Sequence, residues 1–173
     1  AANAVLWNLF LIGGFFLDGF TIASEAACGQ AVGARDREAF AVAARLSLLW
    51  SLGFGIGVSL LFLGIGHAFI DTVTTNPEVR AAAYAYLPLA AAAPFFAALP
   101  FAMDGIFIGA TWTRAMRDLM LAAVTAYLLA LVAFQALGWG NAGLWAAFLL
   151  FLAARGIGQA LLYPRLGRQS FSS

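Results

Sequence analysis

The sequence predicts an all-α membrane protein, a polytopic bundle of transmembrane helices. Of its 173 residues, 64% are hydrophobic and only 10% are charged, and the mean hydropathy is +0.92. Soluble domains contain about 45–50% apolar and about 25% charged residues. The apolar residues also form long stretches separated by short polar segments. Composition and patterning together therefore predict a chain that crosses the lipid bilayer several times.

The same composition argues against several classes of function. A net charge of +1 without a basic patch disfavours a nucleic-acid partner. The one cysteine, Cys28, excludes an internal disulfide and any multi-cysteine metal site, and its small size suits helix packing. No catalytic triad, metal cluster or phosphate-binding loop is recognisable, so we expect neither an enzyme nor a bound cofactor or metal.

Five spans are predicted, at about residues 2–32, 39–70, 77–110, 117–137 and 142–163, in a single transmembrane domain over residues 1–173. The first is longer than the roughly 20 residues that cross a bilayer, and a polar loop at 33–38 ends it. The second is uncharged between residues 46 and 66. Its Gly53 and Gly57 have the small-xxx-small spacing that predicts close approach of another helix.

The third span has a clear start and an unusual interior. Asn76, Pro77 and Glu78 provide a cap, a first-turn proline and a first-turn acid. Within the span, three prolines recur at six-residue intervals, and each removes a backbone donor: Pro88, Pro94 and Pro100. They are either passive kinks that serve packing or hinges of the kind found in transporters.

The last two spans are separated by a turn. Residues 119–154 are uncharged and too long for one span, and the turn-forming sequence Gly138-Trp139-Gly140-Asn141 divides them. We expect the last helix to end near Pro164 and to be followed by a Ser-rich C-terminal tail.

The arginines predict the orientation in the cell (inner) membrane. One side of the membrane receives six of them, whereas the other side receives Arg80 alone. The six are Arg35, Arg37, Arg114, Arg117, Arg165 and Arg168. The positive-inside rule then places the N-terminus of this chain outside and its C-terminus in the cytoplasm.

Two acids within the first span are the leading candidates for function. Asp18 and Glu25 are seven residues apart, so they share a helix face with Thr21, and Gly14 and Cys28 continue this polar seam. A charged residue in a bilayer costs about 2.5–3.5 kcal/mol, so we expect the seam to line an interior cavity. The alternative is that one or both acids are structural, capped by a hydroxyl or paired with an arginine.

Asp104 and Arg155 complete the set of candidate ion-coupling and substrate-cavity residues. Asp104 is the third acid near membrane depth, and it either contributes to the cavity or anchors the cytoplasmic end of its helix. Arg155 lies too far from the end of its span to reach water easily, so we expect it to pair with an acid. His67, near the outer end of its span, is expected to be an interface residue rather than a proton relay.

Several local patterns, taken in order, resemble the multidrug and toxic compound extrusion (MATE) transporters, in particular their DNA-damage-inducible protein F branch. They span almost the whole chain: Phe16-Leu17-Asp18-Gly19-Phe20, Gly29-Gln30-Ala31-Val32-Gly33-Ala34-Arg35-Asp36, Asp104-Gly105-Ile106-Phe107-Ile108-Gly109-Ala110-Thr111, Met116-Arg117 and Arg155-Gly156. The resemblance implies two six-helix lobes around a central cavity, with this chain supplying helices eight to twelve. The first lobe and the seventh helix are then missing partners of this partial C-terminal lobe.

The resemblance also bears on coupling. It implies that an acid of the missing first lobe contributes to proton coupling in this branch. It further implies that, in the related sodium-coupled branch, an aspartate of the tenth helix binds the cation, which makes Asp104 a candidate for that role.

We therefore expect a secondary active antiporter that exports organic, often cationic or amphipathic, small molecules in exchange for H⁺ or Na⁺. One alternative is a lipid-linked oligosaccharide flippase of the same superfamily, which would need a cationic cavity, whereas the charges at membrane depth here are mainly acidic. The other alternative is a non-transporting membrane scaffold. A scaffold predicts that neutralising Asp18 and Glu25 affects stability only.

Overall fold

The computed structural model describes residues 1–171, so the last two serines of the predicted tail lie outside it. It contains five helices: α1 (Ala2–Gly33), α2 (Arg37–Val73), α3 (Pro77–Gly109), α4 (Thr113–Ala136) and α5 (Gly140–Ser170). All five are long and apolar enough to cross a membrane, and residues 1–171 contain no strand. The predicted all-α fold of five spans is confirmed.

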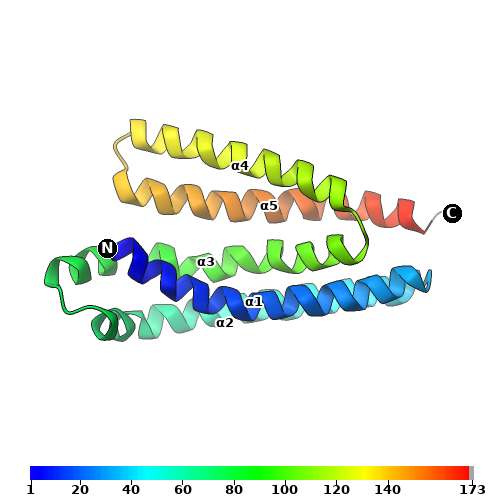
Figure 1. Ribbon diagram of the computed structural model, residues 1–173, viewed down its shortest axis with the longest axis horizontal. Helices are drawn as coiled ribbons and strands as arrows, with labels where there is room; N and C mark the ends of the chain where they lie inside the picture. Colours follow the sequence, from blue (N-terminus) through cyan, green and yellow to red (C-terminus); the bar gives the residue numbers. More distant parts are fainter. Residues whose placement is uncertain (172–173) are drawn as a thin grey trace.

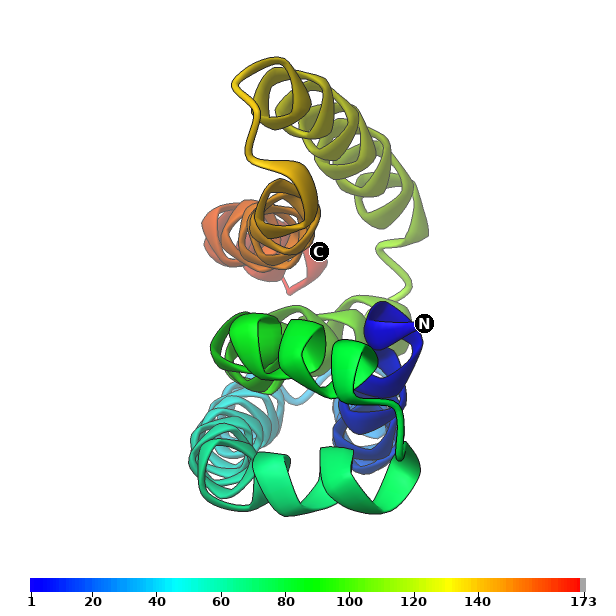
Figure 2. The same cartoon turned by 90° about the vertical axis from the view of Figure 1, so that its left-hand side faces the viewer.

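The helices alternate in direction, so the two termini lie at opposite ends of the bundle (Figure 1). In the end-on view, α3 lies in the middle, with α1 and α2 on one side and α5 on the other (Figure 2). In the apolar stretch of α3 that is long enough to cross a membrane, 67% is buried. In the corresponding stretch of α4, which packs mainly on α5, only 6% is buried. Thus α3 is the core helix, and α4 leaves most of its surface open.

The signals at the helix ends act as the sequence predicts. The Asn76 side chain accepts hydrogen bonds from the backbone N–H of Glu78, at 2.9 Å, and of Val79, at 3.3 Å, and so caps α3. Between α4 and α5, Gly138 and Gly140 adopt φ angles of +76° and +52°. These left-handed conformations are easily adopted only by glycine, which explains why the chain turns there.

The prediction that the last helix ends near Pro164 was wrong, because α5 continues to Ser170. Contacts beyond the proline hold this last part of the helix. The Trp112 indole N–H donates to the Ser170 hydroxyl at 2.9 Å, and the Phe171 ring packs against Phe40 with centroids 5.4 Å apart. Because Pro164 removes only one backbone donor, these contacts are sufficient to continue the helix.

Gly53 and Gly57 make no close helix contact within the described residues. Both glycines are exposed, and a Cβ added at either position would have no neighbour within 4 Å. The close approach of α2 to α3 occurs instead at Gly55, on the opposite side of the helix. A Cβ there would lie 2.8 Å from the Pro94 carbonyl oxygen and 2.7 Å from the Ala98 side chain.

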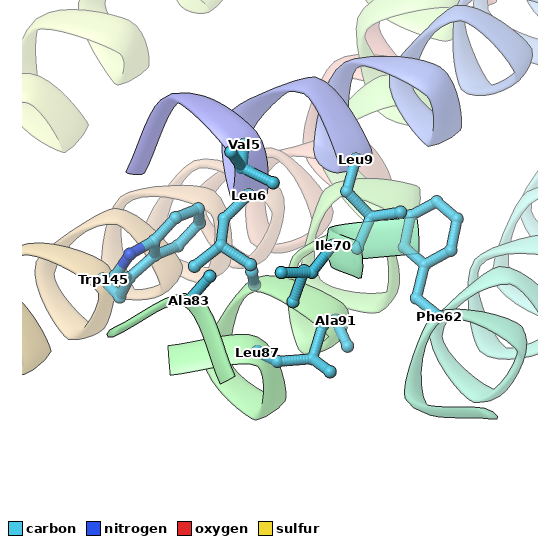
Figure 3. Packing of buried hydrophobic residues seen from close by; sticks show 10 residues of the cluster. Val5, Leu6, Leu9, Phe62, Ile70, Ala83, Leu87, Ala91 and Trp145 are labelled. Carbon is cyan, nitrogen blue, oxygen red and sulfur yellow. The ribbon is translucent and has the colours of Figure 1, made fainter. Parts of the chain in front are cut away.

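Three apolar clusters fill the bundle along its length. The cluster nearest the N-terminus joins residues of α1, α2, α3 and α5 (Figure 3). Its members include Val5, Leu6, Leu9, Phe62, Ile70, Ala83, Leu87, Ala91 and Trp145. Because each cluster includes residues of both α3 and α5, the α4–α5 pair is attached to the other three helices through α5 rather than α4.

Candidate functional site

A buried polar cluster joins α3 to α5 within the membrane-spanning region. The Asp104 carboxylate accepts a hydrogen bond from the guanidinium of Arg155, and the two groups form a salt bridge. The other carboxylate oxygen accepts a hydrogen bond from the Gln159 amide N–H at 2.7 Å. Asp104 is 8% exposed and Gln159 is 1% exposed. The pairing of Arg155 with an acid is therefore observed, and its partner is Asp104.

The sequence around Asp104 brings three helices close together. A Cβ at Gly105 would lie 2.2 Å from the Thr21 carbonyl oxygen, so α1 and α3 pack backbone against backbone here. On the other side, a Cβ at Gly156 would lie 2.9 Å from the Pro100 ring. Small residues therefore let α1 and α5 pack closely against α3 on either side of Asp104. This packing fixes the position along α3 at which the Arg155 side chain meets the Asp104 carboxylate.

The predicted polar seam of α1 is divided between two environments. Asp18 and Glu25 are exposed on the five-helix lobe, whereas Thr21 is half-buried and Cys28 is buried against the rest of the bundle. The Thr21 hydroxyl donates to the Phe101 carbonyl of α3 at 2.8 Å. The structure therefore places the two acids on the surface of the lobe, beside the contact between α1 and α3.

Among the described residues, no hydrogen bond joins Asp18 to the buried cluster. Asp104 uses both of its oxygens within the cluster. Neither Asp18 nor Glu25 has an ion-pair partner among the described residues at salt-bridge distance. Among the acids away from the helix ends, Asp104 is thus paired inside the lobe, whereas Asp18 and Glu25 lie at its surface.

The prolines of α3 leave the helix unbroken, and hydroxyl groups of α2 bond the α3 backbone near two of them. Ser59 accepts a hydrogen bond at 3.0 Å from the backbone N–H of Phe95, which follows Pro94. Ser51 donates to the Ala98 carbonyl at 2.9 Å. Pro94 and Pro100 are buried, whereas Pro88 is exposed. Hydroxyls from neighbouring helices thus bond backbone groups near the two buried prolines.

Sequence reasoning missed two polar contacts. Gln159 follows Arg155 by four residues, so both side chains lie on one face of α5, and this spacing was the available signal. At the other end of the bundle, Asn3 and Asn141 exchange amide hydrogen bonds of 2.6 Å and 2.9 Å, and the Trp145 N–H donates to Asn3 at 3.2 Å. That cluster joins α1 to α5, and no local pattern predicted it.

His67 lies near a third polar cluster, at the end of the bundle where α2 meets α3. Its ring packs on Tyr84 with centroids 4.7 Å apart, and Arg80 forms a salt bridge of 3.3 Å with Asp71. Within residues 1–171, no group of three His, Cys, Asp or Glu side chains could hold a metal ion.

The fold and the buried cluster define a class of protein. Five spanning helices that enclose a salt bridge and carry two more acids on one helix make a multi-pass membrane protein with charged groups at membrane depth, as in transporters.

The comparisons then identify the family. The MatE family model matches residues 1–134, and the chain belongs to this family, whose members are transporters rather than enzymes. It is 36% identical over 170 residues to DNA damage-inducible protein F of Escherichia coli (strain K12). The match covers 95% of this chain and 36% of the relative, so the chain spans about a third of that protein's length. No solved structure matched.

Proposed function

We propose that the full-length protein is a secondary active antiporter of the inner membrane that exports organic, often cationic or amphipathic, small molecules in exchange for H⁺ or Na⁺. The observation that carries the proposal is the exposure of Asp18 and Glu25 on a spanning helix. Facing lipid, each charged acid would cost about 2.5–3.5 kcal/mol. A water-filled cavity, closed by the missing N-terminal lobe, removes that cost.

In this proposal the acids of α1 couple the ion to the substrate. When Asp18 or Glu25 is ionised, it attracts a cationic substrate, and when it binds a proton or Na⁺, that attraction is lost. Ion and substrate then compete for the same face, and each favours a different state of the two lobes. Thr21 fixes the α1 backbone beside the acids through its bond to α3.

The proline segment of α3 is the candidate hinge. Pro94 and Pro100 lie where hydroxyls of α2 bond the α3 backbone, so α3 bends by exchanging a few hydrogen bonds rather than by breaking a continuous ladder. Pro88, which is exposed, lies nearest the N-terminal end of α3 among the three prolines. We propose that such a bend moves Asp104 and α5 together, because the buried salt bridge joins them.

The test is gradient-driven efflux from cells or vesicles that contain the full-length protein. Efflux should collapse when both the proton and the sodium gradients are dissipated. Efflux that persists without either gradient would refute the antiporter, and a full-length protein that moves no organic substrate while remaining folded would favour the scaffold alternative.

The residue-level test compares neutral isosteres. Asp18→Asn and Glu25→Gln should leave the folded amount unchanged while flattening the pH profile of transport, because an amide cannot ionise. Asp118→Asn, an exposed acid at the start of α4, is the matched control and should leave the profile unchanged. Wild-type pH profiles for both α1 variants would show that these acids do not couple transport.

A further inference from the structure

The cluster at Asp104 contains a cation that belongs to the protein itself. A carboxylate buried at membrane depth needs a compensating positive charge, which is supplied by a bound proton, a free cation or a basic side chain. Here the guanidinium of Arg155 occupies one carboxylate oxygen, and Arg155 is itself largely buried, with its side chain 15% exposed.

The second carboxylate oxygen is occupied as well. The Gln159 amide N–H donates to it at 2.7 Å, which fixes the orientation of the amide, because its oxygen could not bond a carboxylate. The amide oxygen, Oε1, is buried and has no hydrogen-bond partner among the described residues. The cluster therefore holds one cation, two occupied carboxylate oxygens and one unused oxygen.

From this arrangement we infer that Arg155 determines ion specificity: its guanidinium is a tethered cation that takes the place of a free alkali cation at Asp104. Hard cations such as Na⁺ prefer oxygen ligands, and the oxygens of Asp104 and Gln159 would supply them if Arg155 were absent. With Arg155 present, the carboxylate is neutralised and one of its oxygens is blocked.

The inference rests on the proposed cation-coupled transport and deepens it, because it separates the roles of the acids. Asp104 becomes a permanently compensated group that joins α3 to α5. Any exchangeable cation then binds elsewhere. Away from the helix ends, the acids of the described spanning helices without a salt bridge are Asp18 and Glu25.

The experiment measures Na⁺ binding rather than transport, so its outcome is independent of whether the antiporter proposal holds. The full-length protein is purified in detergent at about pH 8, where free carboxylates are ionised. Its melting temperature is compared in NaCl and in choline chloride, both at about 0.1 M, so that screening is matched. A ligand that binds only the folded protein raises this temperature by mass action.

We expect the rise in melting temperature in NaCl to be roughly 5 °C larger for Arg155→Met than for the wild type. Arg155→Lys keeps a tethered cation and should respond as the wild type does. Adding Asp104→Asn to Arg155→Met should remove the additional rise, and Asp104→Asn alone should leave the wild-type response unchanged. Arg165→Met, an exposed position on the same helix, is the matched control and should behave as wild type.

Two results would overturn the inference. One is a saturable Na⁺ response of the wild type that Asp104→Asn abolishes, because a free cation would then already bind there. The other is a folded Arg155→Met protein whose Na⁺ response does not exceed that of the wild type. If that variant does not fold, Arg155→Gln replaces it, since its amide retains a donor for the Asp104 carboxylate. The same rise in melting temperature in NaCl is expected for Arg155→Gln, and its absence would refute the inference.

Discussion

Substituting Gly105 by alanine should destabilise the protein more than any other single added methyl group in the α1–α3 contact. The new Cβ would lie 2.2 Å from the Thr21 carbonyl oxygen and 2.7 Å from the Ser24 Cβ. The first neighbour is a backbone atom and therefore cannot rotate away. Helix α1 would have to move by about 1 Å to restore an ordinary contact.

That movement has a cost that can be worked out from the structure. Overpacking in a dense interior costs roughly 1–3 kcal/mol. The same displacement stretches the 2.8 Å hydrogen bond from Thr21 to Phe101, which contributes about 0.5–1.5 kcal/mol. We therefore expect a loss of roughly 2–4 kcal/mol in the free energy of unfolding. Reversible unfolding of the purified full-length protein in mixed micelles measures it.

Gly57→Ala is the matched control. It lies in a spanning helix, but a Cβ there has open space around it, so the methyl group should be neutral or stabilise by up to about 1 kcal/mol through helix propensity. If Gly105→Ala and Gly57→Ala unfold with the same free energy, α1 and α3 do not pack backbone against backbone, and the placement of Asp104 argued from that contact fails.

Three further outcomes are expected. Ser51→Ala should lose about 1 kcal/mol of stability, because its buried hydroxyl no longer bonds the α3 backbone; a neutral result would mean that this bond contributes nothing. Asn76→Ala should cost about 1 kcal/mol by removing the α3 cap, and unchanged unfolding would contradict it. With Cys28 replaced, single cysteines at Thr74 and Arg114 should react with an impermeant reagent from opposite sides of the membrane, the former from outside. Equal labelling of both from outside intact cells would refute the orientation.

Features specified by neighbouring residues were predictable from the sequence. Asn76 caps α3, and the glycines at 138 and 140 make the last turn, because each signal acts within a few residues. The end of α5 was not predictable, because contacts of Trp112 and Phe171 with distant residues hold the helix beyond Pro164. Tertiary packing there overrode a local preference.

Which face of a helix packs inward was harder to predict from the sequence than where the helix begins and ends. Gly53, Gly55 and Gly57 all lie within five residues, and spacing alone favoured the outer two, yet only Gly55 faces α3. Which face of α2 turns inward depends on its partner, and all five helices are apolar over most of their length. The candidate site shows the same limit: the sequence predicted an acid partner for Arg155 but could not select Asp104 over Asp18.

The positions of the two acids explain why Arg155 pairs with Asp104 rather than with Asp18. Asp104 lies on the core helix between two close contacts, at Gly105 with α1 and at Gly156 with α5, so its carboxylate meets the face of α5 that carries Arg155 and Gln159. Asp18 is exposed on α1, and among the described residues it makes no hydrogen bond to the cluster. Because a buried charge is stable only when it is paired, the acid inside the lobe is compensated by α5. The acid at the surface has no salt-bridge partner among the described residues, and we propose that an exchangeable ion or a charged substrate compensates it.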